Sequence, residues 1–120
     1  MKKRILVVDD EEGLRLLYKE ELEDEGWEVE LAASGEESLE KLEKNSVDLV
    51  LLDIKMPSMD PDEVIKRVKE KWKDLPVILC TAYPHYKHDF GTWASDAYIT
   101  KSSDLTELKQ TVKDILGKKP

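Results

Sequence analysis

Residues 49–53 read Leu49-Val50-Leu51-Leu52-Asp53, four apolar residues that end in a carboxylate. A run this short and this apolar is typical of a strand that is covered on both faces. Runs of four apolar residues recur at 5–8, Ile-Leu-Val-Val, followed by Asp9, and at 77–80, Val-Ile-Leu-Cys, followed by Thr81. Strands buried on both faces indicate a parallel sheet with helices on either side, so the predicted fold class is α/β.

Helical periodicity separates these strands from one another. We expect strands at about 4–8, 27–33, 49–52, 77–81 and 97–100, and helices at about 12–25, 35–44, 61–72 and 105–116. Polar and apolar residues alternate over 27–33, which predicts a half-exposed strand at the edge of the sheet. The inner face of the first helix is predicted to consist of Leu14, Leu17, Tyr18 and Leu22. Ser34 and Glu37 predict a capping box at the second helix.

The chain has 120 residues, a length typical of one domain, and no linker or output domain is predicted within it. Its formal net charge is −8, with −10 in residues 1–60 and +2 in residues 61–120, which argues against direct binding of nucleic acid. The longest apolar runs have four residues, whereas a membrane span needs about 20. The single cysteine, Cys80, lies in such a run and predicts a buried thiol in a reducing cytoplasm.

The predicted strands end in polar residues, and the carboxyl ends of parallel strands share the edge of a sheet where ligands bind. These residues are Asp9, Asp10, Asp53, Thr81, Thr100 and Lys101. Three carboxylates at one edge raise one another's pKa unless a cation joins them, and Mg2+ prefers carboxylates, waters and phosphate oxygens. The sequence therefore predicts a site for Mg2+ and a phosphoryl group, with Asp53 as the acceptor because a carboxylate can form an acyl phosphate.

Four stretches of the sequence resemble the receiver domain of bacterial two-component response regulators: 5–11, 52–57, 81–82 and Lys101. The resemblance covers essentially all 120 residues. It implies the flavodoxin-like receiver fold, a five-stranded parallel sheet with strand order 2-1-3-4-5 and helices on both faces. Residues 52–57 and 81–83, with no output domain, look most like the single-domain sporulation phosphorelay class.

The same resemblance implies the partners and the chemistry. A sensor histidine kinase or a histidine phosphotransfer protein would donate the phosphoryl group from a phosphohistidine to Asp53. The phosphorylated chain would then signal to an unknown downstream protein. The chain would be a phosphoacceptor that assists its own phosphorylation and dephosphorylation, not an enzyme with a separate substrate.

Roles for further site residues also follow from the resemblance. Asp10 would bind Mg2+ directly and Asp9 mainly through water. Asp53 and the backbone carbonyl of Lys55 would be further ligands. Lys101 would pair with one phosphoryl oxygen, Thr81 would hydrogen-bond another, and Tyr98 stands where the family has its switch aromatic.

The sequence departs from the receiver pattern at three places. Pro61 stands where Gly is usual, and Ser102 follows Lys101 where Pro is usual. The stretch between Thr81 and Lys101 is also about two residues shorter than in most receivers. We therefore expect a short or irregular fourth helix within 84–93, a trans peptide bond between Lys101 and Ser102, and a Tyr98 that switches less freely.

Other functions on the same fold fit less well. A flavin or nucleotide binder needs a loop that cradles phosphate, and residues 9–12 are all acidic. Phosphohydrolases with an aspartyl nucleophile commonly carry a second Asp where Lys55 stands. His85 and His88 are interpreted as surface residues and not as a metal pair. Two alternatives stay open: a receiver-like interaction module that no longer uses phosphorylation, and a receiver excised from a longer transcriptional regulator.

Overall fold

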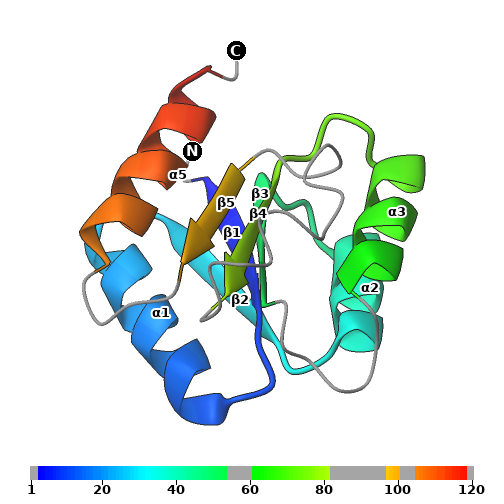
Figure 1. Ribbon diagram of the computed structural model, residues 1–120, viewed down its shortest axis with the longest axis horizontal. Helices are drawn as coiled ribbons and strands as arrows, with labels where there is room; N and C mark the ends of the chain where they lie inside the picture. Colours follow the sequence, from blue (N-terminus) through cyan, green and yellow to red (C-terminus); the bar gives the residue numbers. More distant parts are fainter. Residues whose placement is uncertain (1–2, 54–60, 82–96, 101–104, 119–120) are drawn as a thin grey trace.

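The computed structural model describes residues 3–53, 61–81, 97–100 and 105–118; strands alternate with helices up to residue 81, and a further strand and helix follow in 97–100 and 105–118 (Figure 1). The elements are β1 (Arg4–Val8), α1 (Glu12–Asp24), β2 (Glu28–Ala32), α2 (Gly35–Lys44), β3 (Leu49–Asp53), α3 (Pro61–Lys71), β4 (Val77–Thr81), β5 (Ala97–Thr100) and α5 (Thr106–Lys118). The strands pair in parallel in the order β2-β1-β3-β4-β5. The predicted α/β fold and strand order 2-1-3-4-5 are confirmed.

Two predicted features lie outside the described residues. One is the short or irregular fourth helix within 84–93, and the other is the peptide bond between Lys101 and Ser102. Both stay predictions. Among the helices that the structure does describe, none has the length and apolar character that crossing a bilayer requires.

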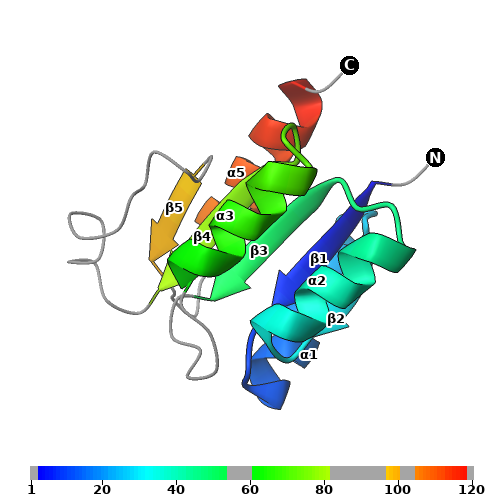
Figure 2. The same cartoon turned by 90° about the vertical axis from the view of Figure 1, so that its right-hand side faces the viewer.

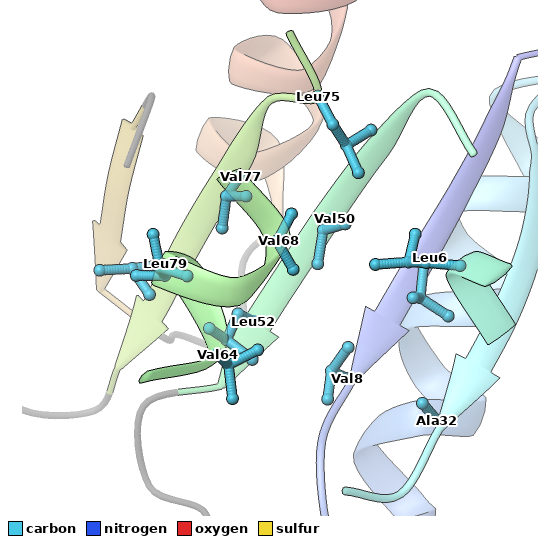
Figure 3. Close-up of a cluster of buried hydrophobic side chains, with 12 residues drawn as sticks. Leu6, Val8, Ala32, Val50, Leu52, Val64, Val68, Leu75, Val77 and Leu79 are labelled. Carbon is cyan, nitrogen blue, oxygen red and sulfur yellow. The ribbon is translucent and has the colours of Figure 1, made fainter. Parts of the chain in front are cut away.

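Side chains of each strand alternate between two apolar layers, because successive residues of a strand point to opposite faces. Helices α2 and α3 cover one face of the sheet and α1 and α5 cover the other (Figure 2). Leu6 and Val8 of β1 pack in the α2/α3 layer, which Figure 3 shows with Val50, Leu52 and Val64. The residues that alternate with these along β1 and β3 belong to the α1/α5 layer; they are Ile5, Val7, Leu49 and Leu51. Burial on both faces explains why these strands are apolar without alternation.

The inner face of α1 is narrower than predicted. Tyr18 and Leu22 are buried and Leu14 is half-buried, but the side chain of Leu17 is 40% exposed and that of Leu16 is 53% exposed. A helix turns about 100° per residue, so Leu17 points about 140° away from Leu22 around the axis. The prediction that Leu17 belongs to the buried stripe is therefore wrong.

Local signals in the sequence set the helix ends. Gly26 follows α1 with a φ of +98°, a left-handed backbone conformation that glycine adopts readily. Its N–H donates to the carbonyl of Glu23 at 3.0 Å, which ends the helix. Ser34 caps α2, since its hydroxyl accepts a hydrogen bond from the N–H of Glu37 at 3.1 Å. The Glu37 carboxylate accepts from the N–H of Ala33, one residue before the cap, instead of closing the box on Ser34.

Candidate functional site

The register of the sheet aligns the strand ends on which the predicted site depends. Val8 pairs with Leu52, so Asp9 and Asp53 each come directly after a paired residue in neighbouring strands. Asp53 pairs with Cys80, and Thr81 pairs with Thr100 at the ends of β4 and β5. The backbone positions of Asp9, Asp53, Thr81 and Thr100 thus lie along one edge of the sheet, where parallel α/β sheets bind ligands.

Asp9 is a buried carboxylate that accepts a hydrogen bond from the backbone. Its side chain is 1% exposed, and one carboxylate oxygen accepts a hydrogen bond from the N–H of Glu11 at 2.9 Å. Its own N–H donates to the carbonyl of Ala32 at 3.0 Å, which extends the pairing of β1 and β2 by one residue. A carboxylate is costly to bury unless hydrogen bonds or a cation compensate the lost hydration. A nearby cation would stabilise the buried Asp9 carboxylate in its charged form.

Asp10 follows Asp9 and is exposed in the turn between β1 and α1. The two carboxylates differ in surroundings, one enclosed and one open to the solvent from which a cation would come. Oxygen donors of this kind match Mg2+, which binds one or two carboxylates and keeps several waters. The described donors therefore fit the predicted cation.

The remaining predicted site residues are described in part or not at all. Among the described side chains, no group of three or more possible metal ligands is assembled. The structure describes Asp53, Thr81 and Tyr98 through their backbone, with Tyr98 paired to Leu79 in β5. Lys55 and Lys101 lie outside the described residues, so the roles expected for all five stay predictions.

Arg15 is a residue beside this site that the sequence reasoning missed. Its guanidinium Nη1 donates to the backbone carbonyl of Asp9 at 2.7 Å, from one turn inside α1. The backbone N–H of Arg15 donates to the carbonyl of Glu11 at 3.0 Å, as expected at a helix start. An Arg on the first turns of a helix has many possible partners, so the sequence offered no signal for this contact.

Comparison with known proteins identifies the family. The family model for the response regulator receiver domain matches residues 5–113. Sporulation initiation phosphotransferase F of Bacillus subtilis (strain 168) is 36% identical over 118 residues, which are 97% of this chain and 95% of that protein. Other curated relatives are longer: the chain spans 49% of the alkaline phosphatase synthesis transcriptional regulatory protein PhoP of the same organism.

Solved structures agree with this family in fold. The response regulator TrrA of Thermotoga maritima in complex with Mg2+-BeF has a TM-score of 0.90 and 50% identity, over 94% of this chain and 98% of that one. TrrA in complex with the histidine kinase ThkA has a TM-score of 0.88 at the same identity, over 95% and 98% of the two chains. Both the sequence match across most of the chain and the shared fold lead to one conclusion. The protein belongs to the response regulator receiver domain family.

Proposed function

We propose that Asp53 accepts a phosphoryl group from a phosphohistidine on a sensor histidine kinase or a histidine phosphotransfer protein, in a Mg2+-dependent reaction. The register that aligns Asp9 with Asp53 at the ends of β1 and β3 carries this proposal. It brings two acidic residues from distant parts of the chain to neighbouring positions at the ligand-binding edge of the sheet. TrrA, to which this chain is similar, has been solved with Mg2+-BeF, which also supports it.

The reaction requires few parts from the protein. A carboxylate oxygen of Asp53 forms a bond to phosphorus while the bond from phosphorus to the histidine nitrogen breaks. Phosphoryl transfer of this kind depends mainly on positioning and on neutralising charge on the phosphoryl oxygens. The bound Mg2+ would supply part of that neutralisation, held by Asp9, Asp10, Asp53 and the backbone carbonyl of Lys55.

The other predicted residues have supporting roles. Lys101 pairs with one phosphoryl oxygen, and the hydroxyl of Thr81 hydrogen-bonds another. Tyr98, three residues before Lys101, is the switch aromatic. The reaction needs no general base, because the attacking group is already an ionised carboxylate.

The proposed setting follows from the same chemistry. Residues 1–120 act as one receiver domain in the cytoplasm, and the phosphorylated form signals through contact with another protein, without binding nucleic acid itself. The complex of TrrA with a histidine kinase supports a kinase partner. The coverage of PhoP, 49%, keeps open the alternative of a receiver that belongs to a longer regulator.

The test is phosphorylation by a small-molecule phosphodonor, acetyl phosphate, with and without Mg2+. Intact-mass measurement is expected to show one added phosphoryl group with Mg2+ and none with EDTA. Asp53→Ala is expected to remain unlabelled, whereas the control Asp74→Ala, an exposed carboxylate before β4, is labelled like the parent. Equal labelling of Asp53→Ala and the parent would contradict the assignment of the acceptor.

A further inference from the structure

We propose that Arg15 is a positioning residue for the cation site. By holding the backbone carbonyl of Asp9, it orients the carboxylates of Asp9 and Asp10 for a divalent cation. This role rests on the proposed Mg2+-dependent function. It adds to that function a residue which touches neither the cation nor the phosphoryl group.

Three hydrogen bonds of Asp9 that the structure describes restrain the turn that joins β1 to α1. The N–H of Asp9 is bound to Ala32, the Asp9 carboxylate is bound to the N–H of Glu11, and the Asp9 carbonyl is bound to Arg15. The first two are made by backbone donors, which persist when side chains change. The third, at 2.7 Å, is made by the Arg15 side chain alone. It is also charge-assisted, which makes it stronger than a bond between neutral groups.

The Asp9 carbonyl belongs to the same rigid peptide unit as the N–H of Asp10, because the peptide bond is planar. Holding that carbonyl therefore fixes the direction in which the chain enters Asp10. Without Arg15 the peptide unit loses this restraint, and the exposed Asp10 carboxylate is held less firmly relative to buried Asp9. Residues that orient metal ligands in this way typically change metal affinity by about 10- to 100-fold.

Charge and position predict opposite effects of removing Arg15. The guanidinium places a positive charge beside four acidic residues at 9–12, so Coulomb's law alone predicts that its loss would tighten Mg2+ binding. Loss of positioning predicts weaker binding. The sign of the change in Mg2+ affinity therefore separates a positioning role from a purely electrostatic one.

The experiment is a calorimetric titration of the full chain with MgCl2, without any phosphodonor. Arg15→Ala is expected to raise the dissociation constant for Mg2+ about tenfold. Arg15→Lys, which keeps the positive charge and replaces the guanidinium with a shorter ammonium donor, is expected to recover part of the affinity. The matched control is Lys19→Ala, which removes a positive charge one turn further along α1, where Lys19 pairs with exposed Glu23. Its affinity is expected to stay within about twofold of the parent, since screening weakens distant surface charges.

Unchanged or tighter Mg2+ binding by Arg15→Ala would overturn the positioning role. Thermal unfolding in EDTA checks that each variant is folded. If Arg15→Ala does not fold, Arg15→Gln replaces it, and affinity at or above that of the parent overturns the role in the same way. Failure of the parent itself to bind Mg2+ would instead overturn the proposed function.

Discussion

Lys109 on α5 lies 2.7 Å from the carboxylate of Glu21 on α1, across 88 residues of sequence. Glu25, the residue that caps the C-terminus of α1, pairs with Lys113 at 2.9 Å and with Lys109 at 3.8 Å. The side chains of Lys109 and Glu25 are 23% and 24% exposed, so this pair is better shielded than Lys19 and Glu23, whose side chains are 39% and 44% exposed. This α1/α5 ion network, defined by Glu21, Glu25, Lys109 and Lys113, joins the two helices that cover one face of the sheet.

Removing the shared cation of the α1/α5 ion network is expected to lower the melting temperature. Lys109→Met breaks two ion pairs at once and leaves Glu21 without its 2.7 Å partner. Lys19→Met breaks one exposed pair and is expected to have a smaller effect, because isolated surface pairs contribute little. Thermal unfolding at low and high salt measures both, and the loss for Lys109→Met should shrink as salt screens the network. Equal losses for the two variants would contradict this prediction.

The α1/α5 ion network also predicts a dependence of stability on pH. A hydrogen bond from Lys113 lowers the pKa of Glu25 below 4.5, with burial opposing and the charges of Lys113 and Lys109 assisting. A group with a lowered pKa in the folded state stabilises the fold above its unfolded pKa and loses this effect as pH falls through the folded value. The difference in unfolding free energy between the parent and Glu25→Gln should therefore be present at neutral pH and vanish in acid below 4.5. Urea unfolding at several pH values measures it, and a constant difference would contradict it.

Lys109 provides the basic counterpart. A hydrogen bond to Glu21 raises its pKa above 10.5, with burial opposing and the charges of Glu21, Glu25 and Asp24 assisting. Its contribution is therefore complete below 10.5 and is lost as pH rises through the folded value. The difference in unfolding free energy between the parent and Lys109→Met should therefore stay constant from neutral pH up to about 10.5 and shrink above that value. A loss already complete at neutral pH would contradict the assignment.

The two leucines of α1 on either side of the burial boundary offer a direct check of the corrected helix face. Leu22 is fully buried, and Leu22→Ala is expected to reduce the unfolding free energy by about 2–5 kcal/mol. Leu17 is 40% exposed, and Leu17→Ala is expected to cost less than about 1 kcal/mol. Urea unfolding of both variants measures the contrast. Similar losses at the two positions would mean that Leu17 is buried after all.

Strands were the most predictable part of this fold, and packing between helices was the least. The runs at 5–8, 49–52 and 77–81 have a composition that only burial on both faces explains, so fold class and the shared strand edge followed from sequence. The exposure of Leu17 did not, because apolar spacing alone does not fix where a buried face ends. The contact between Lys109 and Glu21 depends on how α5 meets α1, which no local pattern reports.

The candidate site shows the same division. Asp9 and Asp53 could be placed near each other because the ends of parallel strands must share an edge. The burial of Asp9 and its bond from Glu11 depend on the turn after β1, and the bond from Arg15 depends on a side-chain rotamer. Sequence spacing therefore predicted which residues meet, but not which of them is enclosed or what holds it.

Asp10 is expected to be costly for the fold when no cation is bound. Asp10 is followed in the sequence by Glu11 and Glu12 and preceded by Asp9, and like charges in one short segment repel one another. Asp10→Asn removes one of these charges. In EDTA we therefore expect its free energy of unfolding to exceed that of the parent by up to about 1 kcal/mol, which would raise its melting temperature. The control Glu20→Gln removes an exposed charge from α1 beyond this cluster and should give a smaller change.

Adding Mg2+ should reverse the order of the melting temperatures of the parent and Asp10→Asn. A ligand that binds the folded state raises its stability in proportion to the logarithm of its concentration relative to the dissociation constant. The parent and Glu20→Gln are expected to gain melting temperature with MgCl2, whereas Asp10→Asn gains little because it lacks a ligand carboxylate. Thermal unfolding across a MgCl2 series measures this gain. If the melting temperature of Asp10→Asn rose as much as that of the parent, Asp10 would not be a Mg2+ ligand. The charge repulsion between Asp10 and the neighbouring acidic residues would then need a reason other than cation binding.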